Sequence, residues 1–113
     1  MARRLNLSRH CLGLETRIEC ALRQLADAPG RWVLFCAAGM AHAQPSAIRV
    51  QGPFHGLAEG EVVLAAIAQH LLLQGYVESN EPSIWSLHMQ AELRRLNAAY
   101  ARQRGDCQFR PET

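Results

Sequence analysis

The sequence predicts an α+β protein in which a small, mainly antiparallel sheet of two to three strands is packed by three helices. Two short apolar runs, 31–38 and 46–51, are rich in residues that favour strands and lie close together in the chain. Three longer segments repeat their apolar residues at three- and four-residue spacing, the period of a helix. The 113 residues fit a single domain, 1–113, with flexible tails expected at 1–7 and 105–113.

The first helix is expected to begin at Ser8, which can cap it, and to run to about Asp27. Glu19 and Arg23, four residues apart, would form an ion pair on its solvent side. The sequence Ala-Pro-Gly at 28–30 is expected to end it. Its apolar stripe consists of Cys11, Leu14, Ile18, Ala21, Leu22 and Leu25.

The two expected strands follow this helix. Arg31–Ala38 is apolar at nearly every position, which predicts a central strand covered on both faces. Ser46–Gln51 alternates apolar and polar side chains, and the short link favours antiparallel pairing with the first strand. The residues Gly-Pro-Phe at 52–54 are expected to break the second strand and turn the chain.

Two further helices complete the predicted fold. One is expected from about Leu57 to Gln74, with Gly75 just past its end, and residues 76–78 can add a short edge strand. The last helix is expected to open at 82 or 83 and to run to about Arg102. Its inner stripe consists of Trp85, Met89, Leu93, Leu96 and Tyr100.

The helix at 57–74 is apolar on more sides than one small sheet can cover. One arc of it, formed by Val63, Leu64, Ile67 and Leu71, suffices to pack on the sheet. The remaining apolar residues are either covered by another helix or exposed for self-association or for a partner protein. The candidate partner-binding residues are Val62, Leu72 and Leu73 on this helix, and Ile84 and Leu87 opposite the inner stripe of the last helix.

The composition and motifs favour a binding protein over an enzyme. A net charge of +2 and a pI near 8.5 are low for a nucleic-acid-binding domain, so no direct nucleic-acid partner is expected. The sequence has no His/Cys metal-ligand spacing, phosphate-binding loop or nucleophile motif, and we predict no catalytic, metal or cofactor-binding residues. Neither an export signal nor a membrane-length apolar run is present, which predicts a cytoplasmic protein without membrane association.

The four cysteines, at positions 11, 20, 36 and 107, include no C-x-x-C pair. Reduced thiols are expected in the cytoplasm. On a shared helix, Cys11 and Cys20 would face opposite ways and would not bond to each other. The favoured interpretation is that two or three cysteines serve as small buried residues, and a redox switch is the alternative.

Two resemblances sharpen the functional expectation. The run IRVQGPFHGLAEGEVVLAAIAQHLLLQGY looks like the core of the peptidoglycan-binding SPOR domains, and it implies a ligand-binding module. The chain as a whole resembles the QslA family of pseudomonad quorum-sensing anti-activators, through WVLFCAAGMAHAQPSAIRVQGPFHG and PSIWSLHMQAELRRLNAAY.

The second resemblance implies a homodimer that binds a LuxR-type transcription factor similar to LasR, blocks its dimerisation and so keeps it off DNA. We therefore expect a non-enzymatic regulator in quorum sensing that acts through a protein partner. The alternatives are a SPOR-like ligand-binding module and a small enzyme of unknown type.

Overall fold

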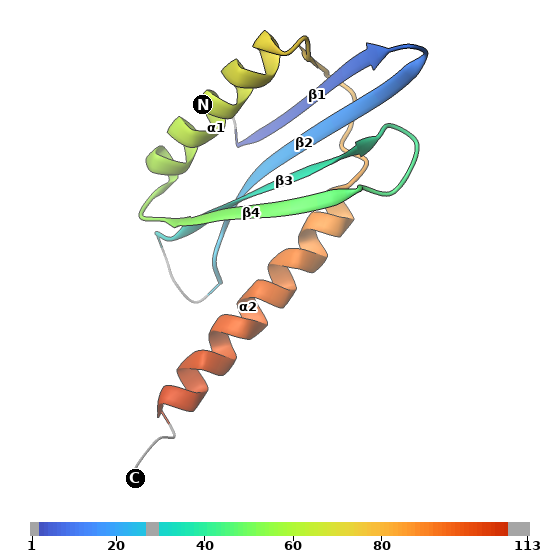
Figure 1. Ribbon diagram of the computed structural model, residues 1–113. Helices are drawn as coiled ribbons and strands as arrows, with labels where there is room; N and C mark the ends of the chain where they lie inside the picture. Colours follow the sequence, from blue (N-terminus) through green and yellow to red (C-terminus); the bar gives the residue numbers. More distant parts are fainter. Residues whose placement is uncertain (1–2, 27–29, 109–113) are drawn as a thin grey trace.

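The computed structural model describes residues 3–26 and 30–108, with side chains described as far as residue 102 (Figure 1). This part of the chain forms one five-stranded antiparallel sheet, of order β4-β3-β2-β1-β5, and two helices. The expectation of a two- to three-stranded sheet packed by three helices is therefore wrong. The elements are β1 (Arg4–Cys11), β2 (Leu14–Gln24), β3 (Trp32–Met40), β4 (Ala47–Phe54), α1 (Leu57–Leu73), β5 (Val77–Glu78) and α2 (Ser86–Gln108).

The hairpin of β1 and β2, residues 4–24, takes the place of most of the helix predicted at 8–27, and residue 27 lies outside the described residues. Cys11 pairs with Leu14, so the loop contains only Leu12 and Gly13, whose φ angles are +54° and +78°. Positive φ at both central residues is the geometry of a tight turn that matches the twist of the two strands. The register of β1 and β2 places Leu7 opposite Ile18, which puts apolar side chains of both strands on one face of the sheet.

The central strands agree with their prediction, and the end of β4 does not. β3 lies between β2 and β4 and is antiparallel to both. β4 continues through the residues expected to break it, since Phe54 still pairs with Trp32. The sheet accommodates this continuation through a register shift between Trp32 and Leu34 and a φ of +114° at Gly52. A Cβ at Gly52 would lie 3.0 Å from the carbonyl oxygen of Trp32.

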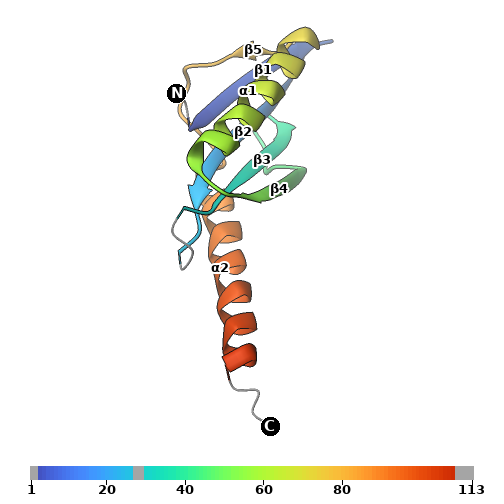
Figure 2. The same ribbon diagram turned by 90° about the vertical axis from the view of Figure 1, so that its left-hand side faces the viewer.

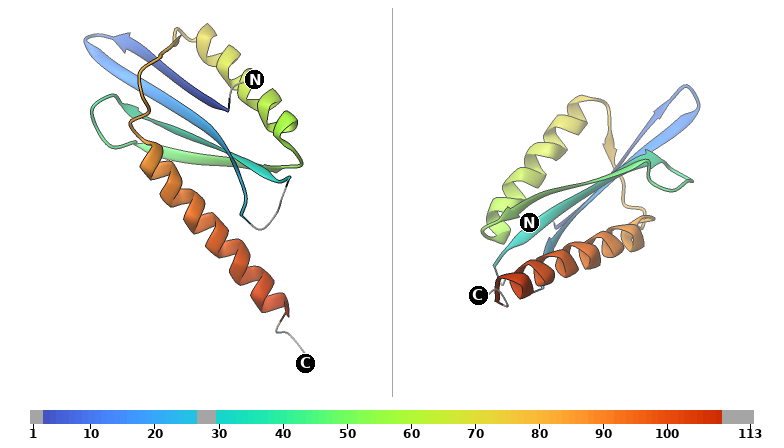
Figure 3. Two further views of the ribbon diagram at one scale, coloured as in Figure 1. Left: turned by 180° about the vertical axis from the view of Figure 1, so that it is seen from behind. Right: turned by 60° about the horizontal axis from the view of Figure 1, so that its bottom comes forward.

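The two helices cover opposite faces of the sheet, and Figure 3 shows the sheet between them. The alternation of side chains along β2 and β3 divides the apolar residues into two cores. Under α1 the buried residues are Cys20, Leu22, Leu34 and Leu64. Under α2 the core consists of Ala21, Leu25, Val33, Phe35, Ala37, Trp85 and Met89.

α1 packs through the arc predicted for it. Leu64 and Leu71 are buried, while Val63 and Ile67 are half-buried against the core. Gly60 lets the helix lie close to β2, because a Cβ there would approach the Leu22 side chain to 2.7 Å. The helix ends as expected before Gly75, which has a φ of +95°. The short edge strand that follows pairs with β1.

α2 starts a few residues later than predicted and extends further. Of the predicted inner stripe, Trp85, just before the helix, and Met89 are buried. Leu93, Leu96 and Tyr100 are half-buried. Figures 1 and 2 show that the helix runs past the end of the sheet, in a molecule of 61 × 28 × 20 Å.

The expected tails overlap regular structure, since β1 begins at residue 4 and α2 ends at residue 108. Residues 1–2 and 109–113 of these tails lie outside the described residues, whereas residue 3 is described. Residues 28–29 of the expected helix stop also lie outside them.

Candidate functional site

The outer face of α1 is an exposed apolar stripe. Its apolar residues are Ala58, Val62, Ala65, Ala66 and Leu73, and the polar Gln69 lies among them. All six are exposed and within about 60° of the direction of Val62 on an ideal helix. The exposed fractions of Val62 and Leu73 are 66% and 84%, and Leu72, at the edge of the stripe, is 43% exposed. Glu59, Glu61 and His70 border the stripe with polar groups. An apolar surface with a polar border is typical of protein-binding sites.

The other two predicted partner-binding residues lie on the far side of the sheet. Ile84 precedes α2 and Leu87 is in its first turn, with exposed fractions of 46% and 75%. Ile84 also helps to line a shallow hollow together with Ala41, His42, Ala43, Gln44, Trp85 and His88. The five predicted residues therefore form two separate exposed groups, one on each face of the sheet.

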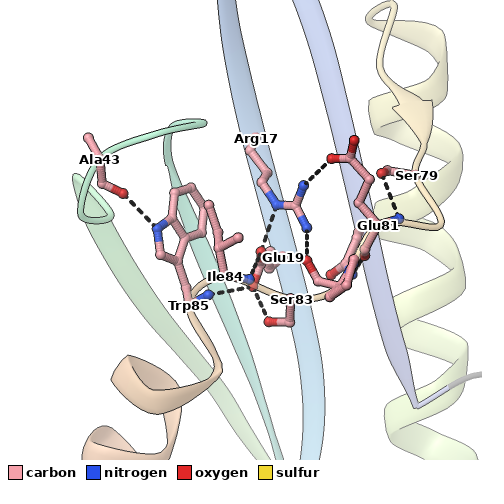
Figure 4. A network of polar contacts seen from close by, with 10 residues as sticks. Arg17, Glu19, Ala43, Ser79, Glu81, Ser83, Ile84 and Trp85 are labelled. Carbon is pink, nitrogen blue, oxygen red and sulfur yellow. Dashed lines mark hydrogen bonds and ion pairs between the residues drawn. The ribbon is translucent and has the colours of Figure 1, made fainter.

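A buried carboxylate fixes the start of α2, and sequence reasoning missed it. Glu19 lies on β2 and is fully buried (Figure 4). Its carboxylate accepts hydrogen bonds from the backbone N–H groups of Ile84 (2.8 Å) and Trp85 (3.1 Å), and from the Ser83 hydroxyl. Glu19 thus binds N–H groups at the start of α2 that have no partner within the helix, where the helix dipole also favours a negative charge.

Arg17 neutralises this carboxylate from two residues earlier on the same strand. Its Nε donates to Glu19 Oε2 at 2.6 Å, and its two terminal nitrogens donate to Glu81 Oε1 (3.3 Å) and to the Pro82 carbonyl (2.8 Å). Arg17 is itself 2% exposed. The pair ties the segment between β5 and α2 to the sheet, and the predicted surface pair of Glu19 with Arg23 is wrong.

The electrostatics of Glu19 follow from these contacts. Burial alone would raise its pKa, but hydrogen bonds from Ser83, Ile84, Arg17 and Trp85 together hold the pKa below the ordinary value of 4.5. The group is therefore a stable anion. Since its hydrogen bonds are all made within the protein, its role is to position α2. A period-two interpretation of β2 would have placed Glu19 beside Arg17 on one face and revealed the pair.

The Trp85 side chain makes a second attachment between α2 and the sheet. Its indole N–H donates to the Ala43 carbonyl at 2.9 Å, and the ring is 1% exposed (Figure 4). The loop after β3 and the start of α2 are thereby held together. This attachment and Glu19 fix the position of Ile84 and Leu87.

The described side chains contain no cluster of three or more His, Cys, Asp or Glu residues that could hold a metal ion. In the same part of the chain, neither helix is long and apolar enough to span a membrane.

Comparison with curated proteins and with solved structures gave no match. A family model, described as PA4575-like protein, matches residues 1–113, the whole chain. The chain belongs to the family of PA4575-like proteins, which is associated with Pseudomonas.

Proposed function

We propose that this protein is a non-enzymatic regulator that binds another protein through the outer face of α1. The observation that carries the proposal is the exposure of Val62 and Leu73 on a helix whose opposite side is already packed on the sheet. Burying a leucine or valine contributes roughly 1.5–3 kcal/mol. A few such residues on one face of a helix are enough to anchor an interface of modest size.

The partner we propose is a LuxR-type transcription factor in a quorum-sensing circuit, bound so that it can neither dimerise nor reach DNA. The proposal is supported by the resemblance to QslA and by a family associated with Pseudomonas. The physical basis of the proposal is competition between this protein and a second regulator molecule for the regulator's dimer interface. Dimer interfaces are richer in apolar surface than the rest of a protein, so an exposed apolar helix is suited to cover one half of such an interface.

The exposed residues on the opposite face, Ile84 and Leu87, are assigned to self-association into a homodimer. Two separate apolar groups would allow the protein to dimerise through one and to bind the regulator through the other. Because the sheet lies between them, a change at one group should leave the other intact.

Reciprocal variants test both assignments. Leu73→Asp should weaken the complex with the ligand-binding domain of a LuxR-type regulator at least about tenfold, since a loss of about 1.4 kcal/mol suffices for that change. It should leave the homodimer intact. Leu87→Asp should dissociate the homodimer and leave regulator binding intact. Gel filtration with light scattering measures both species, and circular dichroism verifies that each variant is folded.

Leu12→Asp is the matched control, because Leu12 is a fully exposed leucine at the tip of the β1–β2 hairpin, outside both groups. It should change neither assembly. If wild-type protein forms no complex with the regulator domain, or if Leu73→Asp binds as tightly as wild type, the proposed function is wrong. If Leu73→Asp is unfolded, Leu73 belongs to the core and the assigned surface is wrong.

A further inference from the structure

Two cysteines face each other at the centre of the sheet. Cys20 on β2 and Cys36 on β3 are direct partners in the antiparallel register, so their side chains lie on the same face of the sheet. Directly opposite residues in an antiparallel pair have Cα atoms about 4.5 or 5.5 Å apart. Disulfide-linked residues usually have Cα separations of about 4.4–6.8 Å. The register therefore places these two residues at a separation that a disulfide can bridge.

The two thiols differ in exposure. Cys20 is 1% exposed in the core beneath α1, whereas Cys36 is only half-buried. Cys11 is exposed at the end of β1, but its partner in the register is Leu14. Among the described cysteines, Cys36 is thus the one that a small reagent can reach and that also has a second thiol beside it.

The two thiols also differ in acidity. The hydrogen bond from Cys20 lowers the pKa of Cys36, against the opposing effect of burial. The same hydrogen bond and then burial raise the pKa of Cys20. Arg49 lies opposite Cys36 on β4 and brings a positive charge to the same face of the sheet. Cys36 is therefore suited to react as a thiolate, and Cys20 to remain protonated until its neighbour has reacted.

We propose that Cys20 and Cys36 form a redox-active dithiol site, which a small peroxide such as hydrogen peroxide converts into an intramolecular disulfide. The Cys36 thiolate attacks one peroxide oxygen, the O–O bond breaks, and hydroxide leaves, so that Cys36 becomes a sulfenic acid. The Cys20 sulfur then attacks the Cys36 sulfur and the S–O bond breaks. The hydroxyl group leaves as water with the thiol proton, and in total two thiols and one peroxide give one disulfide and two waters.

This site is independent of the proposed regulator function. Its residues lie between the sheet and the inner side of α1, away from the outer face of that helix. The disulfide would join β2 to β3 across a segment of the chain that includes the connection at 25–31. Closing this segment restricts the unfolded chain, so the oxidised protein should resist urea better than the reduced protein.

The first experiment uses the full chain with Cys11→Ser and Cys107→Ser, so that only the proposed pair remains. The folded protein is treated with hydrogen peroxide, then denatured and alkylated, and its intact mass is measured by mass spectrometry. The expected product has lost two hydrogen atoms, carries no alkyl group, and regains both thiols in dithiothreitol. Detection of protein with both cysteines alkylated, or of cysteine sulfinic or sulfonic acid without a disulfide, would overturn the proposal. So would a disulfide that forms only after the protein is unfolded in urea.

The second experiment tests the order of attack in the same background. Cys20→Ala should accumulate a sulfenic acid at Cys36 that dimedone captures, because no second thiol is present to displace water. Cys36→Ala should leave Cys20 unreacted in the folded state. Equal capture at Cys20 in the folded Cys36→Ala variant would contradict the assignment of Cys36 as the attacking thiol. Circular dichroism identifies any variant that has lost its fold, and the first experiment needs no change at either site.

Discussion

Glu19 is the residue on which the arrangement of α2 most depends. It is a fully buried anion, and its carboxylate joins β2 to the backbone at Ile84 and Trp85. Buried ion pairs are not strongly stabilising relative to a well-packed apolar pair, but removal of one partner leaves the other charge buried without compensation. In this protein that charge would be Arg17, which is 2% exposed.

We predict that Glu19→Ala lowers the free energy of unfolding by about 3–5 kcal/mol, the usual cost of breaking a buried pair. Urea denaturation followed by circular dichroism measures this change. Glu81→Gln is the matched control, because Glu81 contacts the same Arg17 but its side chain is 73% exposed. An exposed ion pair contributes at most about 1 kcal/mol. Equal losses for the two variants would show that burial of Glu19 is not the source of its effect.

The charge of Glu19 also predicts a pH dependence. The folded-state pKa lies below the ordinary value of 4.5, so the contribution of the charge is fully present above that value. It is lost progressively as the pH falls from there through the lower folded-state pKa. The free energies of unfolding of wild type and Glu19→Gln should therefore differ at neutral pH and converge in acid. A difference that stays constant from neutral pH to the acid range would contradict this prediction.

At the scale of elements, the hairpin of β1 and β2 shows why part of the fold was not predictable from periodicity. Leu14, Ile18 and Leu22 recur at helical spacing and also lie on one face of a strand, because a four-residue step is even. The turn carries no Asn-Gly or Asp-Gly signal, and Leu12 adopts a left-handed conformation that is uncommon for leucine. The pattern in this segment therefore fits both structures, and only pairing with β3 decides between them.

The turn supplies a prediction of its own. Leu12 is 97% exposed and has a φ of +54°, so it incurs backbone strain without packing against the rest of the chain. Leu12→Asn should raise the free energy of unfolding by about 1 kcal/mol, because asparagine tolerates this conformation better. Urea denaturation provides the measurement, with Leu14→Asn as a control at an exposed strand position in the same hairpin. A decrease for Leu12→Asn would mean that the side chain makes a stabilising contact.

The other elements were more predictable because their local signals agree with their tertiary surroundings. The predicted span of α1 differs from the observed one by a single residue, and its inner arc is the packed one. β3 is covered on both faces, as its continuous apolar run indicates. The sequence left open whether Val62 and Leu73 are exposed or covered by another helix, since it did not reveal that α2 covers the opposite face of the sheet.

At the scale of the whole molecule, the proposed function depends on the three-layer arrangement. The sheet separates α1 from α2, and each helix uses one side to complete a core (Figure 3). Apolar residues left exposed by this arrangement include those on the outer face of α1 and, beyond the sheet, the group of Ile84 and Leu87. In the proposed function these groups bind a LuxR-type regulator and a second copy of the chain, respectively.

A methyl NMR titration of this protein with the ligand-binding domain of a LuxR-type regulator tests the proposed binding surface directly. The methyl signals of Val62, Leu72 and Leu73 are expected to shift or broaden as the complex forms, while the signal of Leu12 does not change. Changes confined to Ile84 and Leu87, or no change at a saturating concentration of the domain, would contradict the assignment of the outer face of α1 as the binding surface.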